Sequence, residues 1–373
     1  MKKENTPVPP SEAHDIQPDV MESKPQKELN FKRKWLWTLL FIVIAAASIW
    51  AVAMYSKQFS GESFRTYLHR ASFGGLAAAV LCMLAFVYFE AAAILHISRA
   101  FGYGASTRDG FLYASSDIYF SAITPSATGG QPACAYFMMK DGIPGAVVTV
   151  VLLVNLAMYT LSILCIGLLC LIVRPGIFLG FNLLSRILVI IGCTFQGGLV
   201  FIFFLLLKKE KLFHAICDGT LRLLGRLHLL RHIDRKRQKL TVAIADYRRY
   251  ASIAIAHKKM LIGAFVYNFL QRMAQLMVAV FAFFATGGSL SNAVDIWAAQ
   301  SYVVLGSNCI PVPGAMGVAD YLMLDAYDQW MDRAAAANLE LLSRSLSFYC
   351  CILFCGVSVL IMYCIRKARR KSS

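Results

Sequence analysis

Six apolar segments of this chain are each long enough to cross a lipid bilayer as an α-helix. A helix rises 1.5 Å per residue, so roughly 20 residues cover a hydrocarbon core of about 30 Å. Lipid offers no hydrogen bonds to backbone amides, so continuous apolar segments of this length cross it as helices. The predicted spans are residues 35–55, 72–97, 145–173, 187–207, 260–286 and 345–365. The sequence therefore predicts an all-α polytopic membrane protein.

Composition supports this fold class, because 58% of the 373 residues are hydrophobic and only 16% are charged. The net charge of +16 is compatible with a nucleic-acid partner, but the Lys and Arg residues lie between apolar segments and are not interleaved with aromatic residues. The positive-inside rule explains them more simply. The 11 cysteines contain no Cys-x-x-Cys pair, so we interpret them as small buried hydrophobic residues and predict no metal site.

Two further apolar segments, residues 110–139 and 293–330, are interrupted by proline and glycine. Proline cannot continue a helix, and glycine permits close approach of the backbone. In the second segment the interrupting residues are Pro311, Pro313, Gly314 and Gly317. Each flanking half is about 15 residues, or roughly 22 Å of helix, which is too short to span. We expect two half-helices that meet at a loop buried in the membrane; an external loop between interfacial helices is the alternative.

The order of segments predicts an inverted repeat. Span, span, broken segment and span occur twice, and the second copy starts from the opposite side of the membrane if each broken segment is a re-entrant pair. With both termini in the cytoplasm, Lys and Arg are roughly five times more frequent inside than outside. The predicted organisation is a disordered tail (1–31), a transmembrane domain (32–366) and a basic tail (367–373).

A basic stretch, residues 208–259, lies between the two copies. It mixes leucine, isoleucine and phenylalanine with many arginines and lysines, a pattern typical of amphipathic helices on an anionic membrane surface. A solvated linker that is basic only because it is cytoplasmic is the alternative.

Polar side chains within the apolar segments gather near the two breaks. Asp117, Ser121 and Thr124 follow one another at helical spacing and lead into Pro125, which is followed by Gly129 and Gly130. Around the second break lie Asn308 and Asp320. A charge at the centre of a spanning helix costs on the order of 2.5 to 3.5 kcal/mol, so these residues need partners or a purpose. Hydrogen bonding between helices is the structural explanation, and a substrate site is the functional one.

Two charges lie within predicted spans that the repeat makes equivalent. Glu90 lies in one, and Arg272, with Gln275 on the same face, lies in the other. Because each charge alone is costly in hydrocarbon, we predict that Glu90 and Arg272 form a charge pair across the interface between the repeats. If they do not, Arg272 is better assigned to the phosphate of a lipid.

The motifs Thr124-Pro125-Ser126-Ala127-Thr128-Gly129-Gly130-Gln131-Pro132 and Pro311-Val312-Pro313-Gly314-Ala315-Met316-Gly317-Val318-Ala319-Asp320 resemble the two signature loops of a bacterial family. This is the transmembrane, or flippase, domain of lysylphosphatidylglycerol synthase, also called the multiple peptide resistance factor. Here Ala315 replaces the second glycine of the second loop, and Asp320 carries a carboxylate that is usually a glutamate.

The resemblance implies a multi-pass protein of the bacterial plasma membrane that translocates a phospholipid, such as an aminoacylated lipid, between leaflets. The candidate substrate-binding residues are those of the two breaks and of the Arg272 helix face. Full-length family members also carry a soluble domain that transfers lysine from lysyl-tRNA to phosphatidylglycerol. We expect no such domain after the last span, which leaves room for only a short basic tail.

Two other functions remain open. An enzyme, phosphatidylglycerol lysyltransferase by family name, would need a nucleophile or an acid–base constellation, and we find none. The chain also shows no cofactor motif, since Gly129 and Gly130 lack a P-loop lysine. A membrane scaffold for a separate synthase is the other alternative. The expected partners are a phospholipid and the anionic membrane surface. A homo-oligomer or a separate synthase is compatible with the sequence. We expect no nucleic acid, apart from lysyl-tRNA in the enzyme hypothesis.

Overall fold

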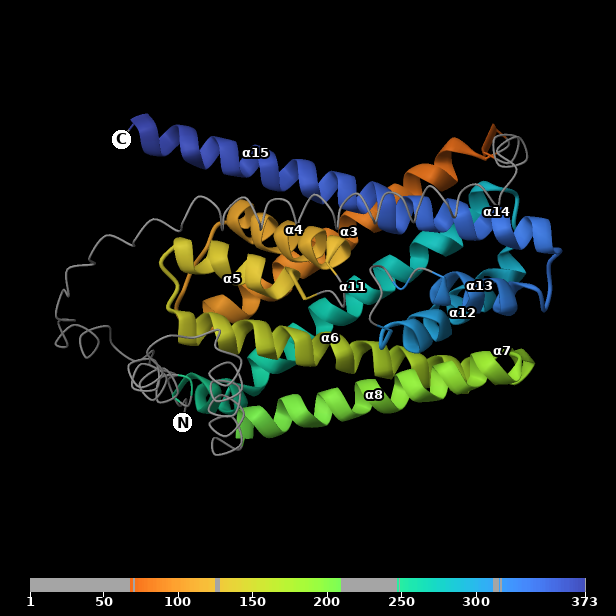
Figure 1. The fold of residues 1–373 in the computed structure, drawn as a ribbon, viewed down its shortest axis with the longest axis horizontal. Coiled ribbons are helices and arrows are strands. Elements are labelled where there is room, and N and C mark those ends of the chain that lie inside the picture. The colour runs from red at the N-terminus through yellow and green to blue at the C-terminus, as the bar shows by residue number, and fades with distance from the viewer. Residues whose placement is uncertain are drawn as a thin grey trace, which may run out of the picture. The chain divides into compact units, whose positions relative to one another are not determined.

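The computed structural model describes residues 68–69, 71–124, 128–208, 247, 249–310, 315 and 317–372. The part described is all-helical and contains no β-strand. Its principal helices, shown in Figure 1, are α3 (Phe73–Ala100), α4 (Thr107–Ile123), α5 (Gly130–Lys140), α6 (Gly145–Val173), α7 (Pro175–Gly180), α8 (Leu183–Lys208), α11 (Lys258–Ala285), α12 (Ala293–Ser307), α13 (Val318–Tyr327), α14 (Arg333–Arg344) and α15 (Cys351–Ser372). The predicted tail 1–31, the first predicted span 35–55 and most of the basic stretch 208–259 lie outside the described residues.

Five helical segments in the described part are long and apolar enough to cross a membrane. They are Phe73–Ala100, Gly145–Val173, Leu183–Leu205, Lys258–Ala285 and Arg333–Arg366. The helices at four of the five positions match the prediction closely. The fifth begins about a dozen residues before the predicted start at 345, because α14, a short π-helical turn at Ser345–Cys350 and α15 follow one another without a break. Arg344, which precedes the predicted span, therefore lies within a helical segment.

Two helices of the predicted equivalent spans, α3 and α11, pack against each other in antiparallel orientation. At one end the Ser72 N–H donates to the Ala285 carbonyl over 2.6 Å. At the other end a Cβ on Gly263 of α11 would collide with the His96 ring of α3. The close approach at both ends means that the helices stay in contact along their length. Arg272 contacts Phe86 of α3, and Glu90 contacts Gln271 of α11, so both charges lie at this interface.

The helices α4 and α5 form a hairpin whose two ends lie together. Arg366 of α15 bonds both to Asp109, in the first turn of α4, and to Asp141, which caps the C-terminus of α5. Ser106 and Asp109 form a reciprocal capping box that fixes the start of α4. The chain continues directly from this end into the N-terminus of α6.

The helices α12 and α13 form a second hairpin at the other end of α6. Arg174, which follows α6, pairs over 2.6 Å with Asp295 in the first turn of α12. Beyond α13, the Gln329 amide donates to the Ile177 carbonyl in α7. The ends of the two hairpins are thus anchored at opposite ends of α6, as the ribbon in Figure 1 shows for α4 and α5 on one side and α12 and α13 on the other.

Helix contacts follow the same scheme in the two halves. The helix α3 packs against α4 and α6, and α11 packs against α12 and α14. Across the halves, α15 packs against α4, and α6 packs against α12. These contacts of the two sets of helices correspond, whereas the contact of α6 with α11 has no equivalent of similar extent between α15 and α3 among the described residues.

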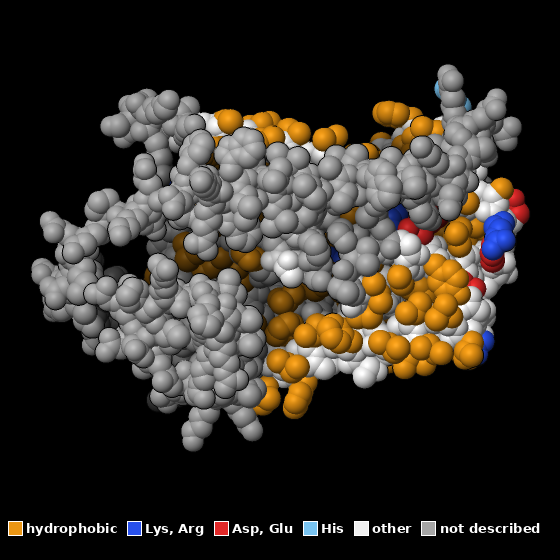
Figure 2. Space-filling model, in the orientation of Figure 1, with side chains coloured by type: hydrophobic (Ala, Val, Ile, Leu, Met, Phe, Trp, Pro, Cys, Tyr) orange, Lys and Arg blue, Asp and Glu red, His pale blue; other side chains and the backbone are white. Residues whose placement is uncertain are grey.

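Apolar side chains cover much of the outside of α7 and α8, as expected of helices that face lipid. Leu183, Ile190 and Phe195 are examples that are more than half exposed. Figure 2 shows hydrophobic side chains over this region, with the visible charges mostly toward one end of the view. Such a surface would be unfavourable in water and is stable in hydrocarbon.

Candidate functional site

A buried polar network joins α3, α6 and α11. The Glu90 carboxylate accepts hydrogen bonds from the Asn155 amide over 2.8 Å and from the Gln271 amide over 2.5 Å. The Asn268 amide donates to the Asn155 side chain over 3.0 Å and to the Ala264 carbonyl over 2.9 Å. All four polar side chains are buried. Hydrogen bonds compensate for removing these groups from water, so the network fixes the carboxylate of Glu90 in one position.

Arg272 lies near this network but has partners of its own. Its guanidinium donates to Gln275 over 2.5 Å and stacks 4.1 Å from the Tyr159 ring centroid and 5.2 Å from that of Phe86. The described residues include no salt bridge between Arg272 and Glu90, although the charge of Arg272 acts on the Glu90 carboxylate through space. The guanidinium Nε meets no acceptor in this part of the chain. Cation–π contacts therefore provide part of the stabilisation of Arg272 that we had expected from a direct pair with Glu90.

A small cavity of about 10 Å³ lies next to Arg272, between α6, α11 and α12. Gln275 and Ser301 supply its polar lining, and Ile166 and Leu276 contribute to its apolar lining. A space of this size is at the lower limit for one water molecule.

The first break brings its polar residues together as predicted from their spacing. The Asp117 carboxylate accepts from the Ser121 hydroxyl and from the Gln131 amide, each over 3.3 Å. The Thr124 hydroxyl donates to the Phe120 carbonyl over 2.6 Å and accepts from the Gly129 N–H over 2.8 Å. Pro125 lies outside the described residues. The end of α4 and the start of α5 are thus held together by side chains of the predicted motif.

Both glycines of this motif are required by close approach. A Cβ on Gly129 would lie 2.6 Å from the Thr124 methyl carbon, which is closer than real contacts allow. A Cβ on Gly130 would overlap the Ser121 hydroxyl and the Asp117 carboxylate. Only hydrogen fits at these positions, so Asp117 lies directly against the backbone of α5.

Asp117 and Glu90 belong to one electrostatic neighbourhood. Both carboxylates are buried, and they lie on α3 and α4, which pack against each other. Together with Arg272 they form a cluster of two formal negative charges and one positive charge, which we call the central cluster. Its excess negative charge suits a cation, and Arg272 suits an anion.

The second break is organised by an ion pair. Asp320 pairs with Arg344 of α14 over 2.5 Å, and its other oxygen accepts from the Gly317 N–H over 2.7 Å. Both charged side chains are more than 90% buried. Beside them lies Glu340, which is fully buried and whose two carboxylate oxygens meet no hydrogen-bond donor among the described residues. Asp320 is thus committed to a structural pair.

Gly317 serves a different purpose from the one expected. We had assigned it to close backbone packing, but a Cβ there would meet no atom within 4 Å. Its φ of +82° is a conformation that residues with a side chain rarely adopt. Pro311, Pro313 and Gly314 lie outside the described residues, and Asn308 is an exposed residue at the C-terminus of α12.

Four residues of these networks were not predicted: Asn155, Gln271, Glu340 and Arg344. Asn155 is the one amide in the uncharged segment 145–173, and such an isolated polar residue is a signal that a membrane helix has a partner there. Glu340 and Arg344 are spaced one helical turn apart, which could have identified a helix before residue 345. In the described part of the chain, no group of His, Cys, Asp and Glu is arranged as a metal site.

A family model described as "Lysylphosphatidylglycerol synthase TM region" matches residues 36–355, which is most of the chain. The chain belongs to this family. Membership of the lysylphosphatidylglycerol synthase TM region family confirms the resemblance carried by the two loop motifs. A search of curated proteins finds no match. Family membership and the apolar helices together establish a multi-pass membrane protein.

Proposed function

We propose that this protein moves a phospholipid between the leaflets of the bacterial plasma membrane, with an aminoacylated lipid such as lysyl-phosphatidylglycerol as the expected class. The observation that carries the proposal is the central cluster of Glu90, Asp117 and Arg272, which places charges inside helices surrounded by apolar side chains. Intramembrane charges of this kind mark substrate pathways. An ammonium group would bind near the two carboxylates, and a phosphate near Arg272.

The arrangement of the helices supports the same function. Hairpins α4–α5 and α12–α13 are anchored at opposite ends of α6, and the two halves have corresponding helix contacts. We infer two re-entrant helix pairs within an inverted repeat and, with the first predicted span, six full spans. Such repeats place a substrate site near the bilayer midplane and allow access from each side in turn. Both termini are then cytoplasmic, by the distribution of basic residues.

Reconstitution in vesicles tests this function. Purified protein would be incorporated with a fluorescent lysyl-phosphatidylglycerol analogue, and an impermeant quencher would report the fraction in the outer leaflet over time. We expect quenching to exceed half of the label with the wild-type protein and to stay near half with Arg272→Gln. Arg333→Gln, a change of an exposed charge outside the cluster, is the control. No movement by the folded wild-type protein would refute the proposal.

A parallel reaction separates transport from synthesis. The same protein would be incubated with lysyl-tRNA and phosphatidylglycerol, and lipids would be analysed by mass spectrometry. We expect no lysyl-phosphatidylglycerol, because neither the sequence nor the described residues supply an acyl-transfer site. A lysylated product would instead establish the transferase.

A further inference from the structure

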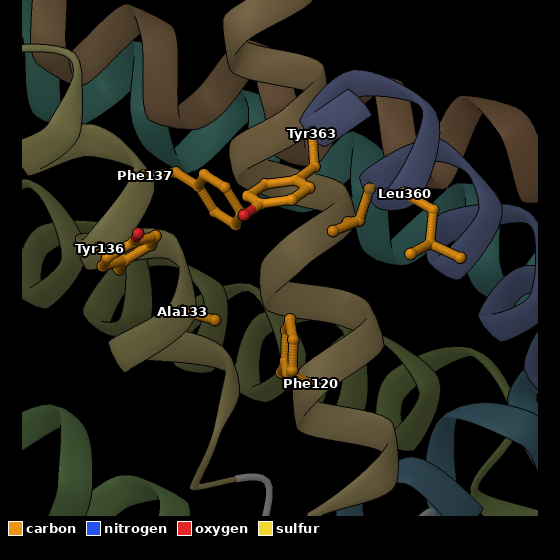
Figure 3. Close-up of a pocket in the computed structure, with 7 residues that line it drawn as sticks. Phe120, Ala133, Tyr136, Phe137, Leu360 and Tyr363 are labelled. Carbon is orange, nitrogen blue, oxygen red and sulfur yellow. The ribbon is translucent and has the colours of Figure 1, made fainter. Parts of the chain in front are cut away.

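An apolar groove lies between the first hairpin and α15, outside the central cluster. Figure 3 shows its lining, with Phe120 from α4, Ala133, Tyr136 and Phe137 from α5, and Leu360 and Tyr363 from α15. The groove has a volume of about 340 Å³, within the range of ligand pockets. Leu360 and Tyr136 are more than half exposed, so the groove is open to the surroundings of the helices. In a membrane those surroundings are acyl chains.

One end of the groove carries a positive charge. The Lys140 ammonium lies 5.4 Å from the Tyr136 ring centroid and 5.6 Å from that of Tyr363, and both rings line the groove. The described residues give Lys140 no carboxylate within ion-pair distance, because Asp109 and Asp141 both bind Arg366. An ammonium group beside two tyrosines, with no carboxylate partner among the described residues, suits a phosphate.

This end of the groove carries the residue types that are typical of a membrane–water boundary. Asp109, Asp141 and Arg366 form an ionic cluster beside Lys140 that is about one-quarter to one-third exposed. Partial burial disfavours the Asp109 carboxylate, but hydrogen bonds from Ser106 and Arg366 outweigh it and hold the pKa of Asp109 below its usual value. The helix α15 continues beyond Arg366 through a run of basic residues in the sequence. Tyrosine rings are typical of such boundaries.

The other end of the groove reaches the first break. Phe120 supplies the carbonyl that accepts from Thr124, and Ala133 lies in the first turn of α5, beside Gln131 and Gly130. From Ala133 to Lys140 is roughly 10 Å along the helix at 1.5 Å per residue. The groove thus connects the boundary with the part of the hairpin that holds Asp117.

We propose that this groove binds a phospholipid, with the phosphate on Lys140 and one acyl chain along Phe120, Ala133 and Leu360. The bound lipid lies parallel to α5, with its headgroup at the boundary and its chain toward the break. Building on the proposed function, the groove is the lateral entrance through which a lipid of the leaflet on the Lys140 side reaches Asp117. Binding itself does not depend on that function.

Photolabelling of the full-length protein in nanodiscs tests the binding. The probe is phosphatidylglycerol with a diazirine in one acyl chain, and labelled peptides would be located by mass spectrometry. We expect labelled residues in α5 and α15, and about fivefold weaker labelling in Lys140→Gln because one basic contact is lost. Ala133→Phe should fill the groove and reduce labelling at least as much. Peptides from α4, α5 and α15 without label would overturn the proposal.

Matched controls separate specific effects from misfolding. Arg333→Gln removes another exposed cation, and Ala334→Phe adds the same ring at an exposed position of α14, so both should label like the wild type. A diacylglycerol probe with the same diazirine has no phosphate, so its labelling should not change in Lys140→Gln. Equal loss with this probe would show that Lys140 does not bind phosphate. Melting temperatures identify variants that do not fold.

The vesicle assay distinguishes failure of this inference from failure of the proposed function. If the groove is labelled but the wild-type protein moves no lipid, the binding site stands and the transport function is refuted. If the wild-type protein moves lipid and folded Ala133→Phe and Lys140→Gln do so at the same rate, the groove is not an entrance. Slower movement in both variants, with normal movement in Ala334→Phe, is the expected result.

Discussion

The two hairpins contain the same kind of break but treat their aspartates differently. Asp117, in the first hairpin, accepts hydrogen bonds from a hydroxyl and an amide among the described residues, both over 3.3 Å. Asp320, in the second, pairs with Arg344 over 2.5 Å and caps a helix with its other oxygen. The first carboxylate therefore has neutral hydrogen-bond partners among the described residues. The second forms an ion pair that holds α13 against α14.

This difference suggests that the two hairpins have different roles. A carboxylate with weak neutral partners can exchange them for a cation, but one in a short buried ion pair cannot do so without breaking the fold. The surroundings of the hairpins also differ: an open groove lies between α15 and the first hairpin, and a small cavity lies between α6, α11 and α12. We expect substitutions in the first hairpin to affect transport more than stability. Substitutions in the second hairpin should affect stability more than transport.

The largest effect on stability is expected at the ion pair of the second hairpin. Arg344→Gln leaves Asp320 buried beside Glu340 without its cation, and removing one partner of a buried pair costs roughly 3 to 5 kcal/mol. Thermal unfolding in detergent, followed by size-exclusion chromatography, would measure the loss. Arg333→Gln is the control, because the contact of Arg333 with Asp328 is 3.9 Å long and exposed, and such pairs contribute less than about 1 kcal/mol. Similar losses in both variants would remove the contrast between the hairpins.

A double-mutant cycle tests the coupling between Glu90 and Arg272. Glu90→Gln disturbs the hydrogen bonds with Asn155 and Gln271 and should cost about 1 to 3 kcal/mol. Arg272→Gln leaves the carboxylate without a nearby positive charge, at a similar cost. Since the two residues interact through space and form no direct pair, we expect the double variant to recover only about 1 kcal/mol. Strictly additive losses would show that the charges are independent, and combining Arg272→Gln with the remote Asp295→Asn should give such additivity.

The sequence predicted most of the helices because their causes are local. Length and continuous hydrophobicity located α3, α6, α8 and α11 to within a few residues, and helical spacing placed Asp117, Ser121 and Thr124 on one face. The start of the last span was missed because Glu340 and Arg344 interrupt its hydrophobicity. The ion pair with Asp320 stabilises Arg344 inside the protein, and Asp320 comes from a different helix.

The partners of Glu90 could not be read from the sequence for the same reason. By its position in the predicted repeat, Arg272 was the expected partner of Glu90. The observed partners are Asn155, which α6 brings to the carboxylate, and Gln271, which lies one residue before Arg272. Which residue of a helix faces its neighbour depends on the rotation of the helix about its axis. A side-chain pattern with polar residues at 268, 271, 272 and 275 leaves that rotation undecided within about one-third of a turn.

Two glycine substitutions, one in each hairpin, should have intermediate effects on stability. Gly317→Ala forces a side chain into a φ of +82° and should cost about 1 to 3 kcal/mol, with unchanged transport per folded molecule. Gly130→Ala pushes against the Ser121 hydroxyl and against both the carboxylate and the backbone carbonyl of Asp117, so it should cost about 1 to 3 kcal/mol and also slow transport. The measurements are melting temperature and vesicle transport normalised to folded protein. Loss of transport in Gly317→Ala and not in Gly130→Ala would reverse the roles assigned to the hairpins.

The smallest effect on stability is expected for Asp117→Asn, which nevertheless tests the site most directly. An asparagine has nearly the same shape and can still accept a bond from Ser121 or Gln131, so the free energy of unfolding should change by less than about 1 kcal/mol. The formal charge of the central cluster rises by one unit, which removes the preference for an ammonium group. Vesicle transport of a lysyl-phosphatidylglycerol analogue should then slow by about tenfold, the equivalent of one lost charged hydrogen bond. Transport of the phosphatidylglycerol analogue, which has no ammonium group, should be unchanged or faster. Asp295→Asn, which removes a partly exposed charge at the start of α12, should slow neither lipid. Equal slowing of both lipids by Asp117→Asn would mean that Asp117 holds the hairpin in shape, as Asp320 does, and that the cation binds elsewhere.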